Sequence, residues 1–431
     1  MARIVITTFG SSGDLNPFLA LGLGLRARGH DVRFATEAMH HPRLIEHDFP
    51  VTRLTGDPEL MLAPYGREMF GSANPIPSLT VLYKHFLIPT LQPRVEELRA
   101  ACADADLLVS SAQQMAPPLL AELTGLPWVS VPLTPAVVSS AEIQILTLPR
   151  ILQPARSLIN RYTLPVAAPL IRRYVDDPVN AVRARYGLPP RRNLFTKGGL
   201  SQRLTAVATS PAFLAPPSDW PAWVRTTGFC FWDTPDTWQE PEGIAAFLAG
   251  DRPVVALSSG SMSVFVPHYF DQFFRTSLHA IWRAGARALV IGAPDGTLPE
   301  PLPDWIRAVP YAPFSHIYPR CAAAIHHGGI GTMAQALRSG IPSLVVPWGA
   351  DQFFNGAQLE RIGAGLWSTR RAYTDRRATR LLRRLLHEPH YRRTATCIAA
   401  QIAREDGVGT LCAAIEGVLP RRRDVLLAAA D

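Results

Sequence analysis

One glycine-rich segment constrains the fold of this chain more than any other part of the sequence. An apolar run, residues 322–325, is followed by two histidines and a cluster of glycines at 326–331. A helix-forming stretch over 332–338 and a second apolar run over 344–346 come next. This order predicts strand, turn, helix and strand in a parallel α/β sheet. The turn leaves backbone N–H groups free at the positive end of a helix, which predicts an anion-binding site.

The two halves of the chain begin in the same way. Residues 3–9 form a strand-like run that leads into the glycine- and serine-rich turn 10–13, and Asn16 and Pro17 then suit an N-cap and a first helical residue. Residues 253–257 repeat the strand-like run before a second polar turn and a helical pattern. Two such beginnings predict an α/β fold of two doubly wound, Rossmann-like domains.

The length of the chain agrees with two domains. Its 431 residues exceed what one hydrophobic core normally serves. We assign residues 1–215 to an N-terminal domain and the proline- and tryptophan-rich residues 216–242 to a linker. Residues 243–431 then form a C-terminal domain whose last helix crosses back to the first domain. Ligands of such sheets bind beyond the carboxyl ends of the strands, so a cleft between facing domains is the expected site.

The basic charge of the chain is carried almost entirely by arginine, with a formal net charge of +8. No basic stretch is interleaved with aromatic residues, so nucleic acid is not expected as a partner. A helix predicted over 375–386 has leucines on one side and arginines on the other. A solvated surface is the favoured interpretation, and peripheral contact with an anionic membrane is the alternative. The apolar, proline-broken residues 126–171 allow two interpretations. They form a loop-rich subdomain packed on the first core, or they form a hydrophobic acceptor pocket or a membrane-facing patch.

The five cysteines are scattered and show no C-x-x-C spacing, so neither a zinc site nor a disulfide framework is expected. A reducing compartment fits this pattern. Met1 leads directly into a strand-like run without the regions of a signal peptide, and the longest uncharged stretch, 126–141, is broken by proline and too short to span a bilayer. We therefore expect a soluble, cytoplasmic protein, with the inner membrane face as the site of any peripheral contact.

The glycine-rich segment resembles the donor-binding signature of family 1 glycosyltransferases, which have the GT-B fold. The matching residues are His326-His327-Gly328-Gly329-x-Gly331-Thr332 and Asp351-Gln352-x-x-Asn355. The first turn, Gly10-Ser-Ser-Gly13-Asp14-x-x-Pro17, resembles the bacterial branch that acts on lipids, sterols and antibiotic aglycones. Segments such as 214–217, 227–229 and 311–313 resemble more narrowly the rhamnolipid rhamnosyltransferases, in which proline is expected at position 327.

This resemblance implies a donor site in the C-terminal domain. His326 would hydrogen-bond a donor phosphate, and the helix start would cradle the diphosphate without a metal. Asp351 and Gln352 would bind sugar hydroxyls, and Tyr311 would stack on the base. The full implied donor set is Ser261, Tyr311, Ala312, His326, Gly328, Gly329, Gly331, Thr332, Asp351 and Gln352. The donor, a dTDP- or UDP-linked sugar, is a substrate, and no cofactor is expected.

Asp14 is the candidate catalytic residue, on the turn where relatives carry a histidine as general base. A carboxylate with an ordinary pKa near 3.9, roughly, is a weak base, but it can take a proton that moves late in a dry cleft. The alternative is a turn or capping residue at the helix start. We favour catalysis because Asn16 is expected to fill the cap.

These residues predict an inverting, metal-independent transferase that moves a rhamnose- or glucose-type sugar onto a hydroxyl of a hydrophobic lipid-like or natural-product acceptor. Three alternatives stay open. Residues 329–334 formally fit a dinucleotide fingerprint, although Asp351 stands too far beyond the second strand. A sugar-nucleotide epimerase shares the fold, and a non-catalytic partner of a transferase would need none of the site residues.

Overall fold

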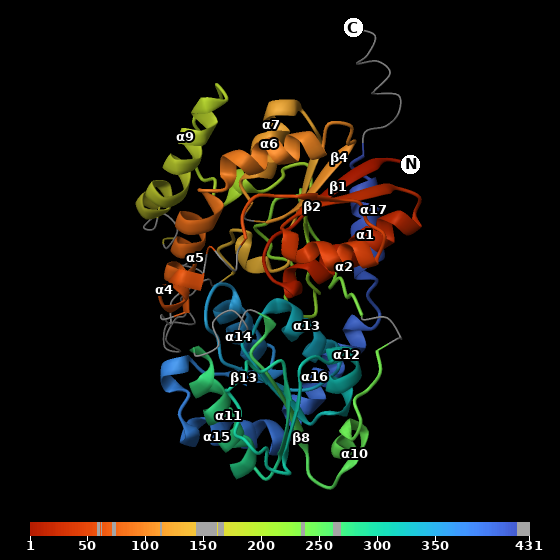
Figure 1. Ribbon diagram of the computed structural model, residues 1–431, viewed down its shortest axis with the longest axis vertical. Helices are drawn as coiled ribbons and strands as arrows, with labels where there is room; N and C mark the ends of the chain where they lie inside the picture. Colours follow the sequence, from red (N-terminus) through yellow and green to blue (C-terminus); the bar gives the residue numbers. More distant parts are fainter. Residues whose placement is uncertain are drawn as a thin grey trace.

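The chain folds into two α/β domains stacked along the long axis of the molecule (Figure 1). The computed structural model describes residues 1–57, 61, 63–70, 75–112, 114–143, 162, 168–233, 238–261 and 269–419. Half of the proline-broken segment 126–171 lies outside these ranges, namely 144–161 and 163–167. None of the helices in the described ranges combines the length and the apolar composition needed to span a bilayer.

The N-terminal domain is built on a parallel sheet with β1 near its centre. Its strands are β1 (Arg3–Thr7), β2 (Asp31–Thr36), β3 (Val51–Arg53), β4 (Leu107–Ser111), β5 (Trp128–Val131), β6 (Thr205–Val207) and β7 (Val224–Thr226). Within the described residues they pair in the order β3-β2-β1-β4-β5-β6-β7. Each neighbouring pair is parallel, as a doubly wound sheet requires.

Helices cover both faces of this sheet because its strands are apolar on both sides. Ile4 and Ile6 of β1 pack with α1, whereas Val5 packs with α6 and α7. The described helices of this domain are α1 (Ser12–Ala27), α2 (His41–Glu46), α4 (Gly66–Phe70), α5 (Pro75–Leu82), α6 (Leu91–Ala101), α7 (Ala116–Thr124) and α9 (Asp177–Arg185).

The C-terminal domain repeats the arrangement on a second parallel sheet. Its strands are β8 (Val254–Ser258), β9 (Arg287–Ile291), β10 (Ile306–Val309), β11 (Ala323–His326), β12 (Ser343–Val345) and β13 (Gly365–Trp367), in the order β10-β9-β8-β11-β12-β13. Its described helices are α10 (Ile244–Ala249), α11 (Asp271–Arg283), α12 (Phe314–Ile317), α13 (Ile330–Arg338), α14 (Gln352–Arg361), α15 (Asp375–His387) and α16 (Pro389–Ile402). The predicted α/β class with two Rossmann-like domains is confirmed.

The first helix begins earlier than the sequence predicts. Ser11, not Asn16, is the N-cap of α1, and Pro17 lies inside the helix. The expectation for Asn16 and Pro17 is wrong because Ser11 and Asp14 form a capping box that starts the helix one turn sooner. Pro17 has no N–H, so the carbonyl of Gly13, four residues before it, gains no helical partner.

The predicted linker, residues 216–242, contains β7. This strand pairs with β6 through Val224, Arg225 and Thr226, so the N-terminal sheet extends into the proline- and tryptophan-rich segment. The arginine-lined helix predicted over 375–386 is α15, with Leu381, Leu382 and Leu385 buried.

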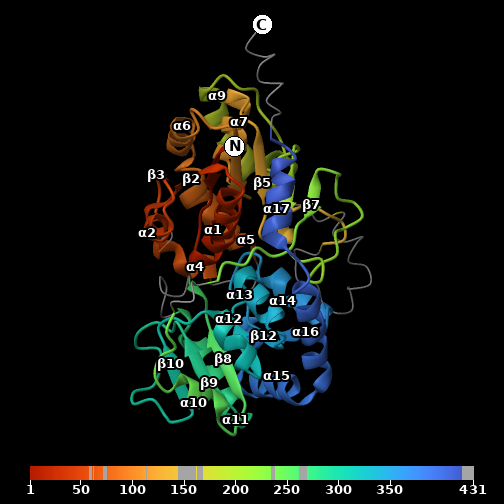
Figure 2. The same cartoon turned by 90° about the vertical axis from the view of Figure 1, so that its right-hand side faces the viewer.

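Each domain receives a piece of chain from the other. Helix α17 (Gly407–Glu416) lies beside α1 in the upper domain (Figure 2), and its Leu411, Cys412 and Ile415 join the core under β1. In the opposite direction, Phe70 at the end of α4 is buried in the C-terminal core with Phe270 and Trp348. The Arg370 side chain of the C-terminal domain donates to the Phe70 carbonyl.

The packing of α17 on α1 depends on the absence of a side chain at Gly24. A Cβ there would lie 2.7 Å from Cγ1 of Val408 and 3.0 Å from Sγ of Cys412. We predict that Gly24→Ala lowers the thermal midpoint of unfolding, although alanine is the better helix former, because overpacking costs roughly 1–3 kcal/mol. Val408→Ala in the same chain should restore most of the loss. A higher midpoint for Gly24→Ala alone would contradict this packing.

Candidate functional site

The cleft between the domains holds two connected cavities at the carboxyl ends of the strands. One, about 320 Å³, is lined by Asp14 and Asp351, and we call it the carboxylate cavity. The other, about 450 Å³, is lined by Tyr311 and Trp232, and we call it the aromatic cavity. The residues that line both are Gly13, Leu133, Gly260, Ser261, Ile330, Gly331 and Thr332. The first turn of α13 therefore stands at the junction.

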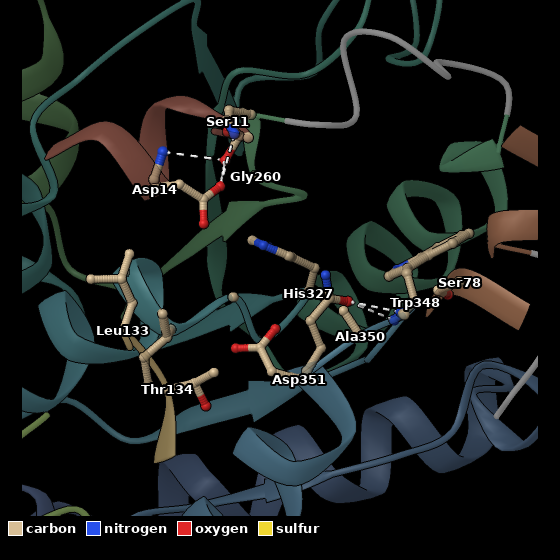
Figure 3. Close-up of a pocket in the computed structure, with 18 of the residues that line it drawn as sticks. Ser11, Asp14, Ser78, Leu133, Thr134, Gly260, His327, Trp348, Ala350 and Asp351 are labelled. Atoms are coloured by element: carbon tan, nitrogen blue, oxygen red, sulfur yellow. Dashed lines mark hydrogen bonds between the residues drawn. The ribbon is translucent and has the colours of Figure 1, made fainter. Parts of the chain in front are cut away.

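Asp14 is placed so that it can fill both of the roles that the sequence left as alternatives. Its Oδ2 accepts hydrogen bonds from the backbone N–H of Ser11 at 2.8 Å and from the Ser11 hydroxyl at 3.0 Å, so it caps α1. The same carboxylate lines the cavity and points into it (Figure 3). Burial raises the pKa of Asp14 above its ordinary value, while the hydrogen bonds from Ser11 act in the opposite direction.

Asp351 stands on the opposite wall, directly before α14. Its Oδ2 accepts a hydrogen bond of 2.8 Å from the side-chain amide of Asn355, which in turn donates to the carbonyl of Gly328 at 2.9 Å. Burial, and then the negative charge of Asp14, raise the pKa of Asp351 from 3.8 to about 6. The two carboxylates face the same space in Figure 3, and a protonated Asp351 relieves their repulsion.

Gln352 fixes the loop that carries Asp351. Its side-chain carbonyl accepts from the backbone N–H of Trp348 at 2.8 Å and of Gly349 at 3.2 Å. Ala350 has a positive φ of 48°, which is uncommon for a residue with a side chain. Both carbonyl contacts leave the amide group of Gln352 as the part that can donate to a ligand.

The two histidines of the signature have different surroundings. His326 is the last residue of β11, pairs with Ser258 and Val345 in the sheet, and is fully buried outside both cavity linings. Its Nδ1 accepts from the N–H of Gly328 at 3.1 Å. His327 lines the carboxylate cavity, and its Nδ1 is buried without a partner among the described residues. Burial lowers the pKa of His327 to about 4, so it is neutral at pH 7.

The glycines around His327 make room for the ring and for a ligand. A Cβ on Gly329 would lie 2.4 Å from Nε2 of His327, and one on Gly260 would lie 2.3 Å from its Cε1. Gly328 does not line either cavity; it has a φ of +94°, and a Cβ there would lie 2.6 Å from Val345. Glycine at these positions is therefore a steric requirement.

Most of the other predicted donor residues lie along the two cavities. Gly329, Gly331 and Thr332 supply the open N-terminus of α13, where the first N–H groups have no helical acceptor. Tyr311 is half exposed in the wall of the aromatic cavity, next to the buried Ala312. Ser261 is exposed at the junction. The structure thus brings together every predicted site residue except His326 and Gly328, which stand behind the cavity wall.

Several cavity residues were not among the ligand-binding residues predicted from the sequence. They include His327, Ser11, Thr134, Trp348 and Arg43. His327 could have been found from strand register, because a strand that ends at His326 places the next residue at the ligand edge. Within the described ranges no three His, Cys, Asp or Glu side chains are grouped to hold a metal ion.

We predict that Asp351→Asn stabilises the ligand-free protein at pH 7.5. Because the pKa of Asp351 is raised in the folded state, folding favours its protonated form, so stability is lost as the pH rises from about 4 towards 6. The asparagine keeps an acceptor for Asn355 and carries no charge. We expect a gain of roughly 1–2 kcal/mol, less than the full 1.4 kcal/mol per pKa unit because water reaches the cleft. Thermal unfolding at pH 7.5 and pH 4 measures it, and a gain that persists at pH 4 would contradict the assignment.

Two family models and several relatives match this chain. Residues 4–141 match the glycosyltransferase family 28 N-terminal domain, and residues 288–407 match the erythromycin biosynthesis protein CIII-like C-terminal domain. O-mycaminosyltylonolide 6-deoxyallosyltransferase of Streptomyces fradiae is 31% identical, over 96% of this chain and 97% of its own. Sterol 3-beta-glucosyltransferase of Aspergillus clavatus is 28% identical over 96% of this chain, which spans only 29% of that enzyme's length.

Solved structures share the arrangement of the two domains. The spinosyn forosaminyltransferase superposes with a TM-score of 0.69 at 19% identity, covering 97% of this chain and 99% of its own. The glycosyltransferase VinC in complex with dTDP gives 0.67 at 22% identity, covering 96% and 99%. These likenesses establish the GT-B fold. Together with the near full-length match to the Streptomyces fradiae enzyme, they show that the chain belongs to the family 1 glycosyltransferases of the GT-B fold and is a glycosyltransferase.

Proposed function

We propose that this glycosyltransferase is inverting and metal-independent, and that it moves a rhamnose- or glucose-type sugar from a nucleoside diphosphate onto a hydroxyl of a hydrophobic acceptor. One observation carries the proposal: Asp14 and Asp351 face each other across a cavity that opens, at the N-terminus of α13, into an aromatic cavity. The carboxylate cavity suits a sugar and an acceptor hydroxyl. The aromatic cavity suits a nucleoside.

The diphosphate belongs at the junction of the two cavities. There the free N–H groups of α13 and the positive end of the helix stabilise negative charge without a metal. The side chain that contacts the donor phosphate is His327 in this proposal, because His326 is buried behind the wall. Tyr311 then lies where a base would stack, and a dTDP donor is supported by the dTDP complex of VinC.

The reaction is a single displacement at the anomeric carbon of the donor sugar. The acceptor oxygen forms a bond to this carbon as its bond to the diphosphate oxygen breaks, which inverts the configuration. Asp14 takes the hydroxyl proton, and the leaving diphosphate carries its charge to the N-terminus of α13. The raised pKa of Asp14 makes it a stronger base than an exposed carboxylate. Asp351 and the amide of Gln352 bind sugar hydroxyls.

The acceptor is hydrophobic in this proposal because apolar side chains of the N-terminal domain line the carboxylate cavity beside Asp14. They are Phe9, Met69, Phe70, Leu79, Leu82, Leu133, Ala136 and Val137. A sterol, a macrolide-like natural product or a lipid fits such a wall. The names of the Streptomyces fradiae and Aspergillus clavatus relatives support the first two.

Asp14→Asn tests the assignment of the base. The amide oxygen keeps the cap on Ser11, so the fold and donor binding should be unchanged while kcat falls by roughly 10²–10⁴, the usual contribution of general base catalysis. The measurements are turnover with a hydrophobic alcohol acceptor and calorimetric binding of dTDP. Wild-type turnover would remove Asp14 from the reaction.

Two histidine variants test whether His326 or His327 contacts the donor phosphate. His327→Ala should weaken dTDP binding by roughly tenfold, as expected for the loss of a hydrogen bond to a charged group. His326→Ala should mainly lower the thermal midpoint, because it opens a hole in the core. Binding by calorimetry and unfolding by scanning fluorimetry report the two effects, and the reverse pattern would restore His326 as the phosphate ligand.

A further inference from the structure

A cation on the N-terminal domain, which we call the acceptor domain because the proposed acceptor binds it, faces the proposed nucleotide site. Arg43, on α2, lines the aromatic cavity. Its Nη1 donates to the side-chain oxygen of Asn16 at 2.9 Å, and its guanidinium carbon lies 5.2 Å from the ring centre of Trp232. A neutral amide and an aromatic face hold the group without neutralising its charge.

The acidic residue in the same wall does not pair with Arg43. Asp233 lines the aromatic cavity but forms its ion pair with Arg338, whose guanidinium lies 4.2 Å from the ring centre of Phe231. No described carboxylate lies within ion-pair distance of Arg43. The cavity wall therefore retains a positive charge that is oriented and available to an anion.

The position of Arg43 relative to α13 follows from the contact between the first turn of α1 and the first turn of α13. A Cβ on Gly331 would lie 3.7 Å from the carbonyl oxygen of Gly13, so the start of α1 and the start of α13 nearly touch. Asn16 is three residues beyond Gly13 on α1, about one helical turn away. Because Arg43 is hydrogen-bonded to Asn16, its guanidinium lines the aromatic cavity on the side of α1 whose first turn meets α13.

We infer that Arg43 is a donor-binding residue that contacts the diphosphate from the acceptor domain, so that both domains hold the donor. The inference rests on the proposed function, since it requires a nucleoside diphosphate in the aromatic cavity. One N–H of the guanidinium donates to Asn16, and the group has further N–H donors that can bind the ligand. Arginine suits this role because its planar fork matches two phosphate oxygens.

Calorimetric titration of the full chain with dTDP, uridine diphosphate and thymidine tests the inference. Arg43→Ala should weaken dTDP binding by roughly 10–100-fold, the range for a hydrogen bond between charged groups, and leave thymidine binding unchanged. Arg43→Lys should lie between, because it keeps the charge and loses the fork. The matched control is Arg26→Ala, which removes an arginine of the same domain that is also stacked on a ring, Phe49 at 4.4 Å, but lies outside both cavities.

A second variant tests the geometry without removing the arginine. Asn16→Asp has the same shape and places a carboxylate on Arg43, so it should also weaken dTDP binding while the thermal midpoint stays near that of the wild type. Unchanged dTDP affinity in Arg43→Ala, or an equal loss for thymidine, would overturn the phosphate contact. A wild-type chain that binds none of the uridine or thymidine diphosphates would instead contradict the proposed function itself.

Discussion

The close approach of two helix starts across the cleft is the contact on which the site depends. The first turns of α1 and α13 meet at Gly13 and Gly331, where neither helix has a side chain to keep them apart. Both helices present the positive end of their dipole to the cleft. In α1 this end is complemented by Asp14, which belongs to the chain. In α13 no side chain caps the end, and in the proposed complex the donor diphosphate takes that place.

The two carboxylates, Asp14 and Asp351, have different hydrogen-bond partners and, in the proposed reaction, different roles. Asp14 accepts two hydrogen bonds from Ser11, which favour the charged form that a base needs. Asp351 accepts its hydrogen bond from Asn355, and burial, followed by repulsion from Asp14, raises its pKa to about 6. In the proposed reaction Asp14 is the carboxyl that accepts the proton, and Asp351 can accept or donate a hydrogen bond to a sugar hydroxyl.

The sequence predicts the fold and most of the site because the decisive signals are local. Strand-like runs, glycine- and serine-rich turns and helical patterns recur at both domain starts. In a doubly wound sheet such turns lie at the carboxyl ends of the strands, where ligands bind. The structure departs from the predicted placements where these depend on one residue of register or on distant partners. The capping box of Ser11 and Asp14 outcompetes Asn16 as a helix start, and β11 extends to His326, which moves His327 into the wall.

Contacts between remote segments could not be predicted in this way. Arg43 is unremarkable in sequence, and only the fold brings it to Asn16 and Trp232. Strand β7 is short and lies among prolines, so it gives no clear alternation until β6 offers it an edge. The roles of these residues come from tertiary structure, whereas the glycine signature carries its role within a few residues.

The exchange of α17 and Phe70 between the domains has a practical meaning for recombining such enzymes. Transferases with one donor domain and another acceptor domain are natural chimeras to build, and the segment between β7 and β8 is the obvious seam. In this molecule that seam would separate Phe70 from its place beside Phe270 and Trp348, and α17 from α1. A functional hybrid must therefore inherit α17 with the acceptor half, and must match the donor half to the incoming Phe70. The unit of exchange is set by these interlocked cores rather than by the linear domain boundary.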